Sequence, residues 1–231
     1  MAQSKTGFAD TGQCVFFDDF LLSGSATTSA PDTLTVQDTS SAGTPVISVK
    51  GNEADGVLQI LHDSTSEAQN IGVHWNDNLM IPAGKGWVVE ARLKLVIGSG
   101  ASLSADQRFV FGVASARNAT LDSVADAAWL RIEGASNDWV LEGDDGTTNT
   151  DDQASSPTTS FTDDVFQVLK IDGRDLSAVR FSIDGTDVGT VDVSGLAATD
   201  GLQIFCELQR DAGTETDACE IDYIRAIWSR T

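Results

Sequence analysis

A two-residue alternation of apolar and charged side chains runs through residues 88–96, which read VVEARLKLV. Successive side chains of an extended strand point to opposite faces of a sheet. The apolar residues of this segment therefore share one face, and the charged residues share the other. The apolar face comprises Val89, Ala91, Leu93 and Leu95, and the charged face comprises Glu90, Arg92 and Lys94. Such a segment is typical of a strand that packs one face against a hydrophobic core.

Strand-like segments recur from one end of the chain to the other, separated by turns rich in Gly, Asp, Ser and Thr. About twelve short strands with almost no helical periodicity predict an all-β fold, an antiparallel two-sheet jelly-roll sandwich. The expected strands are Cys14–Leu22, Gly56–His62, Ile71–Trp75, Trp87–Ile97, Phe109–Ala114, Ala128–Glu133, Trp139–Glu142, Val165–Asp172, Ala178–Asp184, Thr190–Val193, Leu202–Leu208 and Glu220–Trp228.

Four local patterns refine this expectation. Asp184-Gly185 between two strand-like runs predicts a hairpin turn. Asp211–Thr214 is expected to form a second hairpin turn before the final strand. Leu121–Ala128, with apolar residues at helical spacing, is the only candidate helix. The polar, acidic stretch Gly143–Ser160 is expected to be an exposed loop.

The chain is predicted to hold one domain. A length of 231 residues suffices to bury a core without disulfides or metals. We assign residues 13–231 to a single β-sandwich and residues 1–12, which lack a strand pattern, to an N-terminal arm. In the final strand, Ile221, Tyr223 and Ile227 are predicted to complete the core.

The charge balance excludes several classes of partner. The chain has 14 Lys and Arg against 35 Asp and Glu, a formal net charge of −21. This charge repels phosphate backbones and anionic membranes, so we expect no nucleic-acid and no membrane partner. The first residues lack the apolar centre of a secretory signal, and no run of about eighteen apolar residues could form a membrane-spanning helix. We therefore expect synthesis in a cytosol.

The cysteines predict neither a disulfide scaffold nor a zinc site. There are three of them, Cys14, Cys206 and Cys219, and no two form a Cys-x-x-Cys pair. Cys206 and Cys219 flank the predicted Asp211–Thr214 turn and could face each other. The expectation is that they are buried free thiols.

Three segments carry a resemblance to a known superfamily. They are the opening Phe16-Phe17-Asp18-Asp19-Phe20, the late Phe181-Ser182-Ile183-Asp184-Gly185 and the closing Ile221-Asp222-Tyr223-Ile224-Arg225. In these segments the chain resembles the concanavalin A-like lectin/glucanase superfamily, the laminin-G-like jelly rolls. The resemblance implies that the first and last strands pair. It extends, on context more than on residues, to the jelly-roll proteins of tailed-phage virions.

The resemblance also offers an enzyme motif, which the chain does not complete. Retaining β-glucanases of the superfamily carry a Glu-x-Asp-x-x-Glu strand, which Glu220-Ile221-Asp222 begins. Arg225 stands in place of the third acid, and a guanidinium cannot donate a proton at neutral pH. The segment also lies in the last strand of this chain, whereas the glucanase motif lies in the middle of the glucanase chain. We therefore predict a protein that is not an enzyme.

Two groups of residues are candidate binding sites. Trp75 is followed by the polar residues Asn76 and Asp77, which predicts an exposed indole that could stack on a sugar. Calcium prefers about six to eight oxygen ligands, so it is the possible cofactor of the acidic stretch. Its candidate ligands are Asp144, Asp145, Asp151 and Asp152. The alternatives are an indole in the core and a merely solvated loop, and no other cofactor is indicated.

The leading functional hypothesis is a virion structural protein. A rigid acidic jelly roll without a reactive site suits a capsid decoration protein that binds and stabilises the outer shell of a tailed phage. Its partner would be the major capsid protein or another virion protein, and it would be located in the virion. We expect it to form a homo-oligomer. The alternative is a carbohydrate-binding, lectin-like module of a tail, fibre or cell surface, and a third hypothesis is a degenerate glucanase-like hydrolase.

Overall fold

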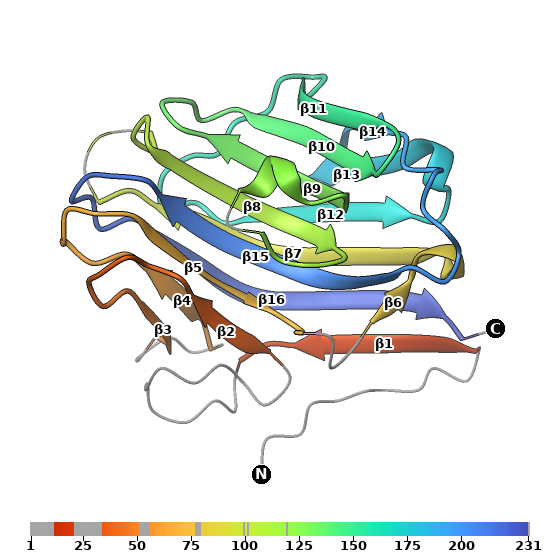
Figure 1. The fold of residues 1–231 in the computed structure, drawn as a ribbon, viewed down its shortest axis with the longest axis horizontal. Helices are drawn as coiled ribbons and strands as arrows, with labels where there is room; N and C mark the ends of the chain where they lie inside the picture. The colour runs from red at the N-terminus through yellow and green to blue at the C-terminus, as the bar shows by residue number, and fades with distance from the viewer. Residues whose placement is uncertain are drawn as a thin grey trace, which may run out of the picture.

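The computed structural model describes residues 12–20, 34–50, 56–76, 80–98, 100, 102–118 and 120–230. Over these residues the chain folds into two antiparallel eight-stranded sheets that face each other (Figure 1). The all-β two-sheet sandwich predicted from the sequence is confirmed. Sixteen strands form among the described residues where about twelve were expected. No helix in this part of the chain is long and apolar enough to span a membrane.

The first sheet, called the β16 sheet here, has the order β14-β13-β12-β7-β16-β4-β3, with β1 paired to β16. Its strands are β1 (Gln13–Asp18), β3 (Val46–Val49), β4 (Leu58–Leu61), β7 (Trp87–Val96), β12 (Gln167–Gly173), β13 (Val179–Ile183), β14 (Thr186–Val191) and β16 (Ala218–Ser229).

The second sheet, called the β15 sheet here, has the order β11-β10-β9-β8-β15-β5-β2, with β6 paired to β15. Its strands are β2 (Thr35–Asp38), β5 (Gln69–His74), β6 (Ile81–Pro82), β8 (Gln107–Ala114), β9 (Asp126–Glu133), β10 (Trp139–Asp145), β11 (Asn149–Ala154) and β15 (Gly201–Arg210). Three short 3-10 turns complete the described elements: η1 (Ala83–Lys85), η2 (Leu121–Ser123) and η3 (Leu176–Ala178).

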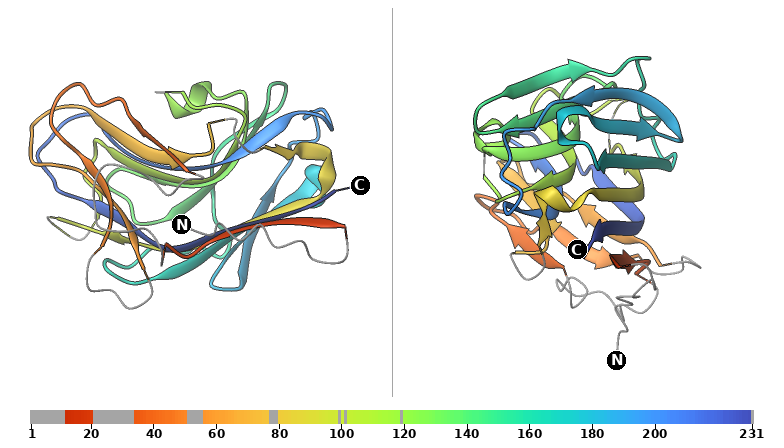
Figure 2. Two further views of the ribbon diagram at one scale, coloured as in Figure 1. Left: turned by 90° about the horizontal axis from the view of Figure 1, so that it is seen from below. Right: turned by 90° about the vertical axis from the view of Figure 1, so that its right-hand side faces the viewer.

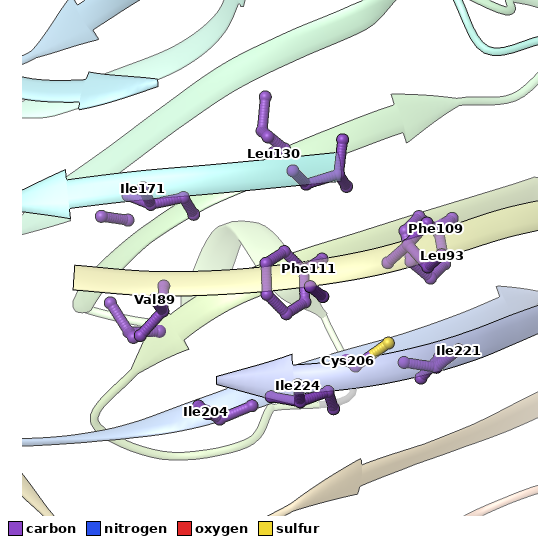
Figure 3. Close-up of a cluster of buried hydrophobic side chains, with 14 of the residues drawn as sticks. Val89, Leu93, Phe109, Phe111, Leu130, Ile171, Ile204, Cys206, Ile221 and Ile224 are labelled. Atoms are coloured by element: carbon purple, nitrogen blue, oxygen red, sulfur yellow. The ribbon is translucent and has the colours of Figure 1, made fainter. Parts of the chain in front are cut away.

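The core fills the space between the two sheets. Figure 3 shows Val89, Leu93, Ile221 and Ile224 of the β16 sheet meeting Phe109, Phe111, Ile204 and Cys206 of the β15 sheet. The alternation read in residues 88–96 sets this arrangement, because every second residue of β7 is buried. Cys206 and Cys219 are fully buried, as expected, and Cys14 packs half-buried against the same core.

Two predicted pairings are confirmed. The first and last strands pair, from Gln13 opposite Ser229 to Asp18 opposite Ile224. β13 and β14 form the expected hairpin, and the backbone of Asp184 and Gly185 is left-handed at its turn, with φ of 51° and 80°. Positive φ at both central residues is the hairpin geometry that Asp-Gly favours.

A bulge in β16 corrects the prediction for the final strand. Ile221 pairs with Leu93, but Tyr223 already pairs with Arg92, so Asp222 is an extra residue in the ladder. An extra residue reverses the faces of every side chain that follows it. The core therefore receives Ile221, Ile224, Ala226 and Trp228, and the predicted core positions of Tyr223 and Ile227 are wrong.

Three further predictions fail. Asp211–Thr214 does not close a hairpin, because β15 and β16 belong to different sheets. The candidate helix Leu121–Ala128 is only the single turn η2, since Asp126 onward joins the sheet between β8 and β10. Residues of the expected loop Gly143–Ser160 form the end of β10 and all of β11. The predicted N-terminal arm, residues 1–12, lies outside the described residues except for its last residue.

His62 gives the fold a pH dependence. The side chain follows β4 and is 1% exposed, and its Nε2 lies 3.3 Å from the carbonyl oxygen of Leu208. Burial, with the nearby charge of Arg210, lowers the pKa of His62 to about 4. The folded state therefore prefers the neutral ring, and this preference stabilises the fold fully above the unfolded pKa of about 6.5.

We expect His62 to destabilise the protein as the pH falls from about 6.5 to about 4, by roughly 2–3 kcal/mol. Urea unfolding across this range, for the protein and for His62→Gln, measures the effect. The difference in unfolding free energy between the two should shrink as the pH falls, because the carboxylates titrate in both. Parallel pH profiles for the two proteins would contradict the prediction.

Candidate functional site

The predicted sugar-stacking role of Trp75 is wrong. Trp75 is fully buried, with the ring of Phe16 edge-on at 5.0 Å and the ring of Trp228 at 6.2 Å. It continues the alternation of the buried residues of β5 into the core, so it has no exposed face. Asn76 is exposed beside it, and Asp77 lies outside the described residues.

The four aspartates of the predicted calcium loop do not converge on one point. Asp145 is buried and accepts backbone N–H groups of Thr147, Thr148 and Gly195. Burial raises the pKa of Asp145, but these donors outweigh it and the pKa lies below its usual value. Asp144, the residue before it in β10, points to the opposite face. Asp151 and Asp152 are exposed on β11, so the predicted four-aspartate site is wrong.

Asp151 instead joins two acids that the sequence analysis did not single out. One carboxylate oxygen each of Asp122 in η2, Glu142 on β10 and Asp151 lie within 4.8 Å of one another. A register shift brings them together: Leu141 pairs with Gln153 and Gly143 with Thr150. Two residues, Asp151 and Asp152, therefore lie opposite the single residue Glu142.

Arg131 on β9 holds this acidic cluster together. It is 4% exposed and forms ion pairs with Asp122, with Glu133 and, at 3.0 Å, with Glu142. Burial raises the pKa of Glu133, Glu142 and Asp152, although the charge of Arg131 opposes the rise. Arg131 thus pairs with three carboxyl groups, and Arg108 also pairs with Glu133. With Asp151 and Asp152 included, the five acids still outnumber the two arginines, so the cluster keeps an excess of negative charge.

An apolar floor lies under η2 on the outer face of the β15 sheet. Trp129 of β9 and Phe205 of β15 are buried there, with ring centroids 5.8 Å apart. Gly112 of β8 lies between them in the sheet, and a Cβ at this position would come within 2.3 Å of the Ala128 carbonyl. The sheet is curved, and the segment with η2 lies over its hollow side (Figure 2). The floor comprises Val110, Ala114, Leu121, Val124, Ala127, Trp129 and Phe205.

A pocket of about 280 Å³ opens beside the cluster, between η2 and the turn that joins β10 to β11. Five of its seven lining residues have polar side chains, which offer carboxylate, amide and hydroxyl groups to a ligand. The lining residues are Asp122, Ser123, Ala125, Asp144, Gly146, Thr147 and Asn149. Groups of this kind bind hydroxyl-bearing ligands by hydrogen bonds.

The same residues fit a calcium ion only in part. Asp122, Glu142 and Asp151 supply hard oxygen ligands, which calcium prefers. Three carboxylates are fewer than the about six to eight oxygens that the ion takes. Two of the three also bind Arg131, whose charge competes with a cation. A calcium role therefore stays a prediction.

The glucanase-like residues Glu220 and Asp222 lie elsewhere, on the outer face of the β16 sheet. Glu220 is 2% exposed and binds Lys50 at 2.7 Å and Lys94 at 3.2 Å. Burial raises the pKa of Glu220, but the two lysines outweigh it and the pKa lies below its usual value. Asp222 pairs with Arg92 at 2.6 Å. A neutralised carboxylate with a lowered pKa does not suit a general acid.

No protein-family model and no curated protein matches the chain. Solved structures do match it in fold. A protein of unknown function from Shewanella oneidensis MR-1 is 16% identical, with a TM-score of 0.65 over 99% of this chain and 92% of that one. The carbohydrate recognition domain of Emp47p is 11% identical, with a TM-score of 0.61 over 96% and 97%. A β-glucanase of Bacillus licheniformis is 12% identical, with a TM-score of 0.58 over 92% and 97%. The concanavalin A-like jelly-roll fold that the resemblance predicted is thereby confirmed.

Proposed function

We propose that this chain, a concanavalin A-like jelly roll, is a carbohydrate-binding module whose ligand lies in the pocket between η2 and the β10–β11 turn. The polar side chains that line that pocket are the observation that carries the proposal. The fold supports it as well, because the chain shares it with a carbohydrate recognition domain and with a β-glucanase.

The charge of the pocket suggests the class of sugar. Asp122 and Asp144 line it, and Glu142 and Asp151 adjoin it, with Arg131 as the partner of two of these acids. Carboxylates accept hydrogen bonds from sugar hydroxyl groups, but they repel the carboxylates of uronic acids. Neutral glycans are therefore the expected ligands.

Substitution of pocket residues tests the proposal. Against a neutral glycan selected on an array, Asn149→Ala and Asp122→Asn should each raise the dissociation constant about tenfold, the loss of one hydrogen bond with a polar or charged partner. Isothermal titration calorimetry measures the change. Asp187→Asn on β14, an exposed aspartate of the other sheet, is the matched control and should bind normally. Binding to no neutral glycan, or equal affinity of all three variants, would overturn the proposal.

A hydrolase is the second candidate, and Glu142 is the observation that favours it. Burial raises the pKa of Glu142, as a general acid requires, and Asp122 and Asp151 are the neighbouring carboxylates. Retaining glycosidases place two carboxyl groups about 5–5.5 Å apart. Arg131 binds both Glu142 and Asp122, which suits a fixed binding surface better than proton transfer. Sugar release from a glucan that Glu142→Gln abolishes would favour the hydrolase.

The capsid-decoration role stays a proposal of its own, with a virion protein as partner and the virion as location. Its support is the acidic charge and the rigid sandwich, and the shared fold supports the sugar-binding alternative more directly. Saturable binding of the purified protein to undecorated capsids would favour decoration. If the protein binds a glycan but does not bind capsids, only the carbohydrate-binding proposal is supported.

A further inference from the structure

The outer face of the β16 sheet, opposite the pocket, gathers exposed apolar side chains. Among the described residues four large apolar side chains are exposed, and three of them lie on this sheet or in the loop before β12. Phe17 of β1 is 37% exposed and stacks on Tyr223 of β16, with ring centroids 5.8 Å apart. Val46 of β3 is 37% exposed, and Val165 in the loop before β12 is 49% exposed.

The cations of the chain are concentrated on the same face. Seven of the fourteen Lys and Arg residues lie there, beside a similar number of the described Asp and Glu residues. The cations are Lys50, Arg92, Lys94, Lys170, Arg174, Arg180 and Arg225, and the acids include Glu90, Asp164, Asp172, Asp184, Asp187, Asp192, Glu220 and Asp222. The other described residues hold six cations and more than three times as many acids.

These charges are matched to one another. Ion pairs join Lys50 and Lys94 to Glu220, and Arg92 to Asp222. Arg92 also lies over the ring of Phe166, with its guanidinium carbon 4.2 Å from the ring centroid. Covering a charged surface is usually costly because it buries charges that have no partner. On this face the ion pairs leave few such charges, so the cost is small.

We infer that two copies of this chain associate through the outer face of the β16 sheet. A symmetric pair brings the same face of each copy together. On this face cations and acids are about equal in number, although the chain as a whole is strongly acidic, and the face carries the exposed Phe17. The overall negative charge of each copy still opposes the approach of a second copy. Salt weakens this repulsion, because at 0.1 M charges more than about 10 Å apart are largely screened from each other. Association therefore strengthens as the salt concentration rises.

Sedimentation velocity tests the inference, with the complete chain at several protein concentrations and from about 0.01 M to about 1 M sodium chloride. The expected result is a monomer–dimer equilibrium that shifts toward the dimer with added salt. Phe17→Glu should weaken the dimer at least tenfold at high salt. The control is Met80→Glu, because Met80 is 50% exposed just before β6 of the other sheet. This variant should dimerise normally.

The outcome separates the alternatives. A monomer at every salt and protein concentration would overturn the inference. Equal weakening by Phe17→Glu and Met80→Glu would place the contact elsewhere and overturn it too. Thermal unfolding of each variant shows that the fold is intact. Should Phe17→Glu unfold, Phe17→Ser, which adds no charge, is expected to weaken the dimer while keeping the fold, and normal dimerisation of that variant would overturn the inference.

Discussion

Replacing Arg210 with alanine is expected to lower the free energy of unfolding by about 3–5 kcal/mol, because it removes a buried charge-assisted network. Arg210 ends β15 and is fully buried. Its guanidinium donates to the backbone carbonyls of Asp63, Thr65, Glu67 and Glu215. One side chain thus joins the loop between β4 and β5 to the loop between β15 and β16. Its loss leaves four carbonyl oxygens without this donor in a buried site.

Urea unfolding measures the effect of Arg210→Ala. The free energy of unfolding of Arg210→Lys should lie between those of the unchanged protein and Arg210→Ala. An ammonium group keeps the charge, but it cannot donate to four carbonyls at once as the planar guanidinium does. Arg180→Ala is the matched control, because the Arg180 side chain is 65% exposed and its pair with Asp187 lies at the surface. That variant should change the unfolding free energy by less than about 1 kcal/mol. An equal change in Arg210→Ala and Arg180→Ala would refute the role given to Arg210.

Trp129→Ala is expected to have a similar effect, about 3–5 kcal/mol, since it empties the volume of a fully buried indole. Trp129 packs against Phe205 and supports the segment with η2, which carries Asp122 into the pocket. The substitution should therefore also weaken glycan binding. Urea unfolding gives the first quantity and calorimetric titration the second.

Trp129→Phe provides the control for this prediction. A phenyl ring keeps most of the contact with Phe205, so the variant should lose less stability than Trp129→Ala and keep the pocket. Hydrogen exchange at the amide groups of Leu121–Ser123 follows η2 directly. Faster exchange there in Trp129→Ala, but not in Trp129→Phe, is the expected pattern. A loss below about 1 kcal/mol in Trp129→Ala would show that η2 does not depend on this floor.

Strong periodicity made most of the fold predictable. The alternation in β7 and the Asp-Gly turn between β13 and β14 are local signals, and both elements formed where they were expected. β11 (Asn149–Ala154) has no such signal, because its sequence NTDDQA lacks apolar alternation and its strand character comes from pairing with β10. The bulge at Asp222 likewise depends on how β16 pairs with β7, which no local pattern shows.

The candidate site was harder to predict, because neighbouring strands assemble it. Asp122, Arg131, Glu142 and Asp151 lie up to 29 positions apart and meet through the register of β9, β10 and β11. One available signal was the charged Arg131 and Glu133 in a strand that is otherwise apolar on both faces after its first residue, Asp126. For Trp75 the local signal was misread: the alternation through Ile71 and Val73 already places it in the core, and its polar neighbours say little about its own side chain.

The contact between Tyr223 and Glu90 gives the protein a built-in optical reporter. Tyr223 is the only tyrosine of the chain, and its hydroxyl donates to Glu90 at 2.9 Å. Burial and this hydrogen bond raise its pKa to about 12. Phenolate absorbs in the near ultraviolet where phenol does not, so an alkaline absorbance titration of the whole protein reads this one position beside Phe17. Any change that opens that face to water should move the midpoint toward the ordinary value of about 10, without a label or a second tyrosine to confuse the signal.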